Sequence, residues 1–593
     1  MDRLESCSNW NFAHPFLAAC VASIALVVSF SLYLLYRIFV RPLVSPVRHV
    51  PGPKSAHPLW GNMEEFAMKP PGRAHVEWAH KYGGAVRYRG LLGQDFVLLT
   101  DPVAMTHLLT NDPYATYEKP AELRGDLSTH LGKGVIFAEG EDHRHQRRML
   151  TPAFAHGNLK AMLPTFFDLS YQLREIWTKR IENQDVDKSA WYYRKDLDEF
   201  ESTKEEGEVV IEVADWVTRL SLDAIGKAGF GYDFDSLYKH DDPLSSAFYT
   251  LFAPRMTTIR IPPKFMLAHQ VFGTILHSLP SMSWAKHLPD ERFKAIFKAC
   301  EDMENESRNI ITAKREAVKR DGRESLKGKK DLISLLLAAE GPDSKFCLTP
   351  EELRGQLNSF LFAGHDTISE TIVWVLWALS RDHARQDRLR QEIRTARAQA
   401  LERGREELDS EDLGGLEFLD AVVRETLRLE PPLAATPRTA IKDDLIPLST
   451  PVPSATDPKR LISHVPVKKG QTCWLGIYAA NRNPAIFGDD AEEFRPERWI
   501  ASEGGDKIES KMGIWSGQMT FLAGPRSCIG YKFALLEIKT VLSVLLDAFE
   551  FFPRNPGMEI ERGTQVITRP FVKGEVHLGT RMPLKIRLAK TEE

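Results

Sequence analysis

Cysteine is scarce in this sequence, and its few cysteines lie far apart. Six occur among 593 residues and none forms a C-x-x-C pair: Cys7, Cys20, Cys300, Cys347, Cys473 and Cys528. A disulfide framework or a zinc site would need cysteines at closer spacing. The sequence therefore indicates a reducing compartment, in which a single thiol can still carry chemistry.

An excess of charge of one sign is also missing. The 77 Lys and Arg residues nearly balance 81 Asp and Glu residues, which leaves a formal net charge of −4 and argues against a nucleic-acid partner. With 43% hydrophobic and 27% charged residues, the composition excludes a largely disordered or fibrous chain. The sequence contains no internal repeat.

Long uncharged runs are limited to one, residues 16–36. As a helix these 21 residues would cover roughly 31 Å, which is close to the thickness of a bilayer core. Three arginines follow the run and one precedes it, so the positive-inside rule puts residues 1–15 in the lumen and the rest in the cytosol. A cleaved signal peptide or a buried helix is the alternative, but the run exceeds a typical signal-peptide core.

Prolines follow this predicted anchor. Residues 37–53 are basic and proline-rich, which predicts a stiff, non-helical connector. Residues 54–593 are then expected to form a single domain with two interruptions. We interpret the charged stretch 184–208 as a solvated insertion, and residues 446–466, with five prolines, as a hairpin with an expanded loop.

The predicted domain is mainly α with small β-sheets, an α+β fold. Amphipathic patterns predict helices over 159–181 and 293–319, whereas residues 86–88 and 96–99 read as strands. A longer helix is predicted over 353–379, because this segment is apolar on nearly all sides.

The centre of that longest helix is polar. Its sequence is Ala363-Gly364-His365-Asp366-Thr367, and unpaired polar groups in a buried helix would cost several kcal/mol. Two explanations remain open. The helix is either locally bent with Thr367 and Asp366 satisfied within it, or these residues face a cavity in which their polarity is used.

A second unusual stretch is FLAGPRSCIG, residues 521–530, which leads into a helical pattern. Cys528 would lie at the start of that helix, where unpaired amides, the helix dipole and Arg526 favour a thiolate, which is a good metal ligand. Gly524 and Gly530 would let a flat group approach the backbone, and Phe521 would pack against its edge. The alternative is an inert, buried cysteine.

This stretch resembles the haem-binding signature F-x-x-G-x-R-x-C-x-G of the cytochrome P450 family. The matching residues are Phe521, Gly524, Arg526, Cys528 and Gly530. Residues 363–367 are similar to the A-G-x-[DE]-T of the family's central helix, and Glu425 with Arg428 resembles its E-x-x-R. Arg498, in FRPERW, would complete the family's structural salt-bridge network. The overall resemblance is to a fungal, microsomal haem-thiolate monooxygenase, with the P450 fold preceded by one transmembrane helix.

The resemblance implies haem b as the cofactor, with Cys528 as its axial thiolate and metal ligand. His143 and Arg147 stand where the family usually has W-x-x-x-R, and Arg438 matches an arginine beyond the E-x-x-R helix. With Arg526, these residues would bind the haem propionates. A surface histidine in a basic stretch is the alternative for His143.

The resemblance further implies insertion of one oxygen atom from O2 into a substrate, with Asp366 and Thr367 as catalytic proton relays and the Gly364 notch admitting oxygen or water. His365 is expected to point away into packing. Only 593 − 528 = 65 residues follow the ligand, so electrons are expected from NADPH through a separate reductase, with cytochrome b5 as an optional second donor. Arg144, Arg148 and Lys532 would steer the reductase. The implied location is the endoplasmic reticulum membrane, with the catalytic domain facing the cytosol.

The substrate is expected to be a hydrophobic small molecule, because the segments that would line the pocket are mostly apolar. These segments are the one after Tyr114 and residues 357–364, 433–436 and 564–567. Terpenoid-type secondary metabolism is the first hypothesis, and fatty-acid or xenobiotic hydroxylation the second. A reductase-independent haem-thiolate isomerase or dehydratase and a non-enzymatic haem sensor are the competing classes.

Overall fold

The computed structural model describes most of the chain, with gaps. The described residues are 15–183, 207–239, 242–244, 246–247, 262–264, 266–268, 291–322, 326, 331–339, 348–503, 512–564 and 567–590. The predicted lumenal segment lies outside them apart from Pro15, and the predicted insertion 184–208 lies outside them apart from its last two residues.

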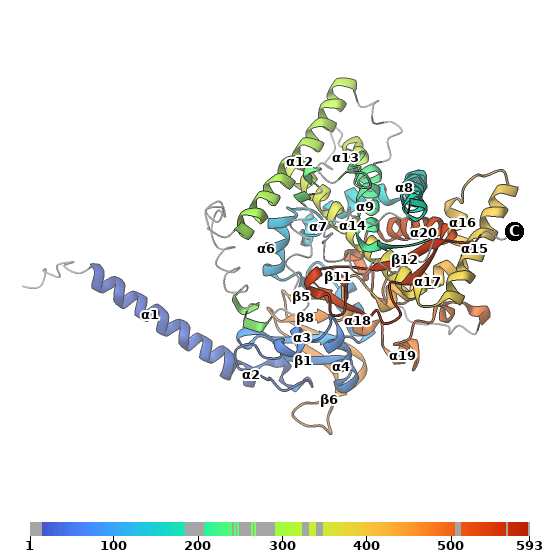
Figure 1. Cartoon of the computed structure of the whole chain (residues 1–593). Helices are drawn as coiled ribbons and strands as arrows, with labels where there is room; N and C mark the ends of the chain where they lie inside the picture. Colours follow the sequence, from blue (N-terminus) through green and yellow to red (C-terminus); the bar gives the residue numbers. More distant parts are fainter. Residues whose placement is uncertain are drawn as a thin grey trace, which may run out of the picture.

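A bundle of long helices forms the centre of the molecule (Figure 1). Helix α14 (Pro350–Ser380) packs against α9 (Val213–Ala224) and α20 (Tyr531–Ala548), and α20 packs against α8 (His156–Asn183). Thr349 begins α14 with a capping box, in which its side chain accepts from the Glu352 amide and the Glu352 side chain accepts from the Thr349 amide. The predicted helices over 159–181, 293–319 and 353–379 are thereby confirmed, the second as part of α12 (Glu291–Asp321).

Other described helices surround this bundle. They are α3 (Met63–Met68), α4 (Arg73–Tyr82), α5 (Pro102–Thr110), α6 (Ala121–His130), α7 (Gly140–Leu150), α13 (Leu332–Ala339), α15 (His383–Glu402), α16 (Ser410–Gly415), α17 (Glu417–Leu429), α18 (Ile477–Ala480) and α19 (Pro484–Phe487).

The strands form small sheets, which confirms the predicted mainly α fold. The largest sheet has the order β1-β2-β8-β5-β3, with β2 parallel to β8. Its strands are β1 (Ala85–Arg89), β2 (Asp95–Leu99), β8 (Thr472–Leu475), β5 (Thr436–Ala440) and β3 (Tyr117–Glu118). A second sheet has the order β4 (Glu208–Glu212), β12 (Pro583–Leu588) and β9 (Phe549–Pro553).

Two antiparallel hairpins complete the described sheets. Strands β10 (Ile560–Thr564) and β11 (Thr568–Val572) form one, and β6 (Asp444–Pro453) and β7 (Leu461–Val467) form the other. The second confirms the hairpin predicted over 446–466, with residues 454–460 as its loop.

The N-terminal helix α1 (Pro15–Leu35) projects from the body, as Figure 1 shows. Helical structure continues beyond it through a π-helical turn (Tyr36–Val40), α2 (Arg41–Val44) and a 3₁₀ turn (Pro46–His49). The predicted non-helical connector is therefore wrong over 37–49. Pro42 lies in the first turn of α2, directly after the π-helical turn, where its fixed φ suits the helical backbone.

Candidate functional site

The loop before α20 places the Cys528 side chain. The Cys528 amide donates to the Phe521 carbonyl at 2.9 Å, and the Ser527 amide donates to the Gly524 carbonyl at 3.0 Å, which closes the loop on itself. Gly530 then begins α20, so Cys528 lies at the helix entrance as predicted. Phe521 is buried beside the Trp515 ring, at 5.5 Å between centroids.

The Cys528 thiol is accessible, but the surrounding protein separates it from bulk water. Cys528 is exposed, yet burial by the surrounding protein raises the pKa of its thiol, against opposing contributions from the Gly530 amide and the Arg147 guanidinium. A side chain that is accessible but separated from bulk water is expected where it faces a chamber enclosed by the protein. The expectation that the polypeptide itself favours the thiolate is wrong, because desolvation outweighs the nearby positive charge.

Of the two loop glycines, only Gly524 differs from the expectation. Gly524 has φ +67°, and a Cβ there would lie 2.1 Å from the Leu109 carbonyl oxygen of α5. Gly524 therefore permits a close approach between the loop and α5, and the space beside it is filled by protein. A Cβ on Gly530 would meet nothing closer than Phe154 Cε1 at 3.5 Å.

Cations gather on one side of this loop. Arg526 contacts the Glu139 carboxylate and the Pro113 carbonyl, and Lys119 Nζ lies 2.7 Å from Glu139 Oε1. Burial alone would raise the pKa of Glu139, but Lys119 and Arg526 hold it below its ordinary value. Burial lowers the pKa of Lys119 to about 8, with the Glu139 charge opposing this effect.

Arg438, on β5, and Arg147, on α7, belong to the same region. Arg147 Nη1 donates to the Ser527 carbonyl at 2.6 Å, beside the thiol. Arg438 donates to the Pro437 carbonyl at 2.7 Å, and burial lowers the pKa of its guanidinium to about 10. The Nε atoms of Arg438 and Arg526 are buried and find no hydrogen-bond partner among the described residues. Buried, unmatched donors on two arginines fit an anionic ligand such as the carboxylates of a haem.

His143 is buried, so the surface-histidine alternative is wrong. Its Nδ1 lies 3.1 Å from the Tyr114 hydroxyl, and burial, together with Lys119 and Arg526, lowers the pKa of the imidazole to about 3. The ring is therefore neutral and can act as a hydrogen-bond partner one helical turn before Arg147.

The polar centre of α14 is partly open. Ala363, Gly364 and Thr367 are only half-buried, whereas their neighbours along the helix are buried. The spacing of these three residues puts them on one face, which indicates that this face borders a cavity. Thr367 Oγ1 donates to the Ala363 carbonyl at 2.8 Å. A Cβ on Gly364 would lie 2.8 Å from Ile225, so the expected notch is a site of packing against that side chain.

Asp366 is held on another side of the helix. Arg569, on β11, donates from Nη2 to Asp366 Oδ2 at 2.7 Å, and His365 Nε2 lies 3.4 Å from Asp366 Oδ1. His365 Nδ1 also lies 2.6 Å from the Leu361 carbonyl oxygen. Arg569 Nη1 approaches a second buried carboxylate, Glu370 Oε1, at 3.7 Å. The polar side chains of α14 thus find hydrogen-bond partners partly within the helix and partly on β11, which is distant in sequence.

Glu425, Arg428 and Arg498 meet in the core. Glu425 accepts from Arg428 at 2.8 and 2.9 Å, from Arg498 Nε at 2.9 Å and from Trp499 Nε1 at 2.9 Å. All three charged side chains are almost fully buried. Opposing the effect of burial, the two arginines hold the pKa of Glu425 below its ordinary value. This network fixes α17 to the segment around Trp499.

Sequence reasoning missed four residues of the site. Lys119, Glu139 and Tyr114 lie among the cations, and Arg569 binds Asp366. None of them belongs to a spaced motif, and Arg569 is 203 residues from Asp366. Only the unusual density of charge before residue 148 could have pointed to the first group.

Comparison with known proteins agrees with this geometry. The sequence profile of cytochrome P450 matches residues 50–576. The chain belongs to the cytochrome P450 family. One similar protein is cytochrome P450 monooxygenase 205 of Postia placenta, 33% identical over 92% of this chain and 93% of that protein. Another is cytochrome P450 monooxygenase claP of Ampulloclitocybe clavipes, 32% identical over 87% of this chain and 88% of that protein. The P450 fold and membership in a monooxygenase family are therefore shown.

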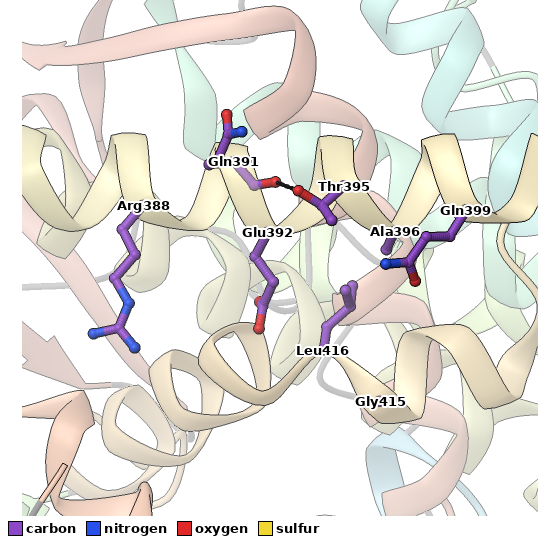
Figure 2. A pocket seen from close by; sticks show the side chains of 8 residues that line it. All are labelled: Arg388, Gln391, Glu392, Thr395, Ala396, Gln399, Gly415 and Leu416. Carbon is purple, nitrogen blue, oxygen red and sulfur yellow. Dashed lines mark hydrogen bonds between the residues drawn. The ribbon is translucent and has the colours of Figure 1, made fainter. Parts of the chain in front are cut away.

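A hollow elsewhere on this P450 does not have the features of a reaction site. About 450 Å³ in volume, it lies along α15 near α16, and Figure 2 shows its lining of polar and apolar residues. Glu392 lines this hollow. Its carboxylate accepts hydrogen bonds from the amides of Phe418 at 2.7 Å and Leu419 at 2.9 Å, so it caps α17. Neither the thiol nor the cation cluster contributes to the lining.

Proposed function

We propose that this P450 binds haem b through Cys528 and inserts one oxygen atom from O2 into a hydrophobic small molecule, by hydroxylation or epoxidation. The observation that carries the proposal is the accessible Cys528 thiol, which the surrounding protein desolvates, beside buried arginines whose Nε atoms find no partner among the described residues. When bound, the haem would supply O2 activation favoured by thiolate ligation.

The cation cluster would hold the haem propionates. Arg438 and Arg526 offer unmatched Nε donors, and the neutral His143 offers a hydrogen bond in place of the family's usual tryptophan. Arg147 is tied to the Ser527 carbonyl, so it would orient the ligand loop as well as contribute charge. Phe521 and Gly530 would border the haem, while Gly524 shapes the loop.

The Thr367 hydroxyl, on the open face of α14, would donate the proton that oxygen activation requires. Its oxygen lies in that half-buried face, and its hydrogen is held by the Ala363 carbonyl until rotation about the side chain redirects it. Asp366 would resupply Thr367 only after leaving Arg569, because Oδ2 is engaged there. Arg569 thus becomes a positioning residue for the relay.

We further propose a membrane-anchored topology: residues 1–15 in the lumen, 16–36 as the span, and one catalytic domain over 54–593 in the cytosol, at the endoplasmic reticulum. Among the described residues, one helix, Cys20–Val44, is long and apolar enough to cross a membrane. NADPH would supply electrons through a separate reductase, with cytochrome b5 as an optional donor. Arg148 and Lys532 are exposed and suit an acidic partner, whereas Arg144 is paired with Glu141.

The substrate proposal is a terpenoid-type secondary metabolite, with a fatty acid or a xenobiotic as the second candidate. It rests on the apolar segments expected at the pocket, of which residues 357–364 end at the half-buried Ala363 and Gly364 on the open face of α14. Incubation with reductase, NADPH and panels of the three substrate classes, followed by mass spectrometry, tests it through products that gain one oxygen atom.

The deciding experiment compares reduced, carbon-monoxide-bound spectra of the wild type and Cys528→Ala. We expect a strongly red-shifted Soret band that disappears in Cys528→Ala and persists in the control Cys300→Ala. An unshifted wild-type band would overturn the thiolate assignment. A shifted band without NADPH-dependent turnover in the presence of reductase would instead favour an isomerase, a dehydratase or a haem sensor.

A further inference from the structure

The segment that follows the predicted span is packed onto the catalytic body. Along residues 36–50 the side chains of Ile38, Pro42, Ser45, Val47 and Val50 are buried. Val47 and Val50 belong to the same hydrophobic core as the β-sheet residues Val97 and Leu99. The connection between anchor and body is therefore a folded part of the domain.

Strands β1 and β2 and the turn between them receive this segment. Arg87 Nη2 donates to the Pro42 carbonyl at 3.1 Å, and the same guanidinium pairs with Asp95 at 2.8 Å. Gly93 lies directly against the π-helical turn, because a Cβ there would come within 2.6 Å of the Arg37 carbonyl oxygen and 2.9 Å of Ile38 Cα. No other residue type fits this approach without displacing the helix.

The β6–β7 hairpin closes over the far end of the segment. His49 Nδ1 lies 2.7 Å from the Thr456 hydroxyl, and the Ala455 amide donates to the His49 carbonyl at 2.8 Å. Thr456 is in the hairpin loop 454–460, so this loop acts as a clasp on the 3₁₀ turn. The segment is thus fixed to the body near both ends and in the middle.

The opposite face of the same segment is apolar and uncovered by the described residues. Phe39, Val40, Leu43 and Val44 are between 47% and 67% exposed. They continue directly from the exposed apolar side chains of α1, such as Leu32 and Leu35. Four large apolar side chains next to a membrane-spanning helix indicate lipid as their environment.

We propose that residues 36–50 form a rigid seat, with lipid acyl chains on one face and the β1–β2 sheet on the other, which holds the catalytic body at one tilt on the membrane. The proposal rests on the membrane anchoring proposed above. Lipid is the occupant of the apolar face because that face is continuous with the span. A flexible proline linker would instead let the body sample many tilts.

The test uses the full-length holoenzyme in oriented bilayers and measures the linear dichroism of the haem absorption. We expect the wild type to show a defined dichroic ratio, because the haem plane keeps one angle to the membrane. Gly93→Ala should move this ratio toward the isotropic value. The matched control is Gly404→Ala, since φ is +69° at Gly93 and +73° at Gly404, but a Cβ on Gly404 would meet none of the described residues within 4 Å.

A second variant covers the case in which Gly93→Ala loses its haem spectrum. Thr456→Ala removes the contact with His49 at an exposed loop residue, and it should also reduce the dichroism. A wild-type ratio at the isotropic value, or a ratio unchanged in both Thr456→Ala and a folded Gly93→Ala, would overturn the rigid seat.

The lipid face is tested with an environment-sensitive fluorescent amino acid at Leu43, and at Leu401 as control. These leucines are 67% and 68% exposed, and α15, which contains Leu401, lies on the opposite side of the body from α2 (Figure 1). We expect vesicles to shift the emission to the blue at position 43 alone. If the protein floats with vesicles but the emission at position 43 does not shift, only the lipid face is overturned. If the protein does not float with vesicles, the membrane anchor and the rigid seat are overturned together.

Discussion

Glu370 is expected to be protonated in the folded protein at neutral pH. Its side chain on α14 is buried, and burial raises the pKa of the carboxyl to about 8, with Arg569 opposing this effect and Asp366 adding to it. No hydrogen bond from the described residues reaches Oε2. In the unfolded chain the same group would ionise near its ordinary value of 4.5. The folded state therefore binds a proton that the unfolded state releases.

The sign of the resulting pH dependence follows from this difference. Because the folded pKa is raised, the contribution of Glu370 to stability is fully present below pH 4.5 and is lost as the pH rises to about 8. At about 1.4 kcal/mol per pKa unit, the interval from 4.5 to about 8 corresponds to an upper value of about 5 kcal/mol. Glu370→Gln should remove this loss, so the variant should gain stability over the wild type as the pH increases.

Two measurements on the holoenzyme check the prediction. Infrared difference spectra at pH 7 should show the carbonyl band of a protonated carboxylic acid that is absent in Glu370→Gln and present in the control Glu402→Gln, whose side chain is exposed. Unfolding midpoints should diverge between wild type and Glu370→Gln from pH 5 to pH 8. The reasoning is refuted if the band is already missing from the wild type at pH 6 and the midpoints run parallel.

Three further outcomes follow from the site. Arg498→Leu removes a partner of the buried Glu425 and should cost about 3 to 5 kcal/mol of unfolding free energy, measured by urea denaturation. Gly524→Ala should abolish haem incorporation, judged by the carbon-monoxide spectrum, whereas Gly470→Ala, also at positive φ but with nothing within 4 Å, should not. Reversing the charges of Arg148 and Lys532 together should slow reduction by the reductase several-fold and flatten its salt dependence, as stopped-flow absorbance would show.

Sequence patterns correctly predicted those helices whose position depends on the local spacing of apolar residues. The periodicity of residues 353–379 and the pattern after Gly530 gave α14 and α20, because apolar spacing reflects the face that a helix buries. Pro42 misled the prediction of the connector. Proline disfavours the interior of a helix but suits its first turn, and Pro42 takes that position in α2, where it and Ile38 are buried against the body.

Long-range electrostatics could not be predicted from the sequence. The Asp366–Arg569 pair joins α14 to β11, and no spacing along the chain indicates which arginine will reach a given carboxylate. The raised pKa of the Cys528 thiol could not be predicted from the sequence either. Its helix N-terminus is visible in the sequence, but the desolvation that raises its pKa comes from the surrounding fold.

The charge balance beside the thiol would connect the proposed haem binding with folding. Lys119, Arg147, Arg438 and Arg526 share this region, and Glu139 is the carboxylate that pairs with two of them. Burial already lowers the pKa of Lys119 and Arg438, so their charged forms are disfavoured here. Two propionates would supply the charge that Glu139 alone does not balance. Haem should therefore stabilise the folded state through this cluster as well as through Cys528, since a ligand that binds only the folded state shifts the equilibrium toward it.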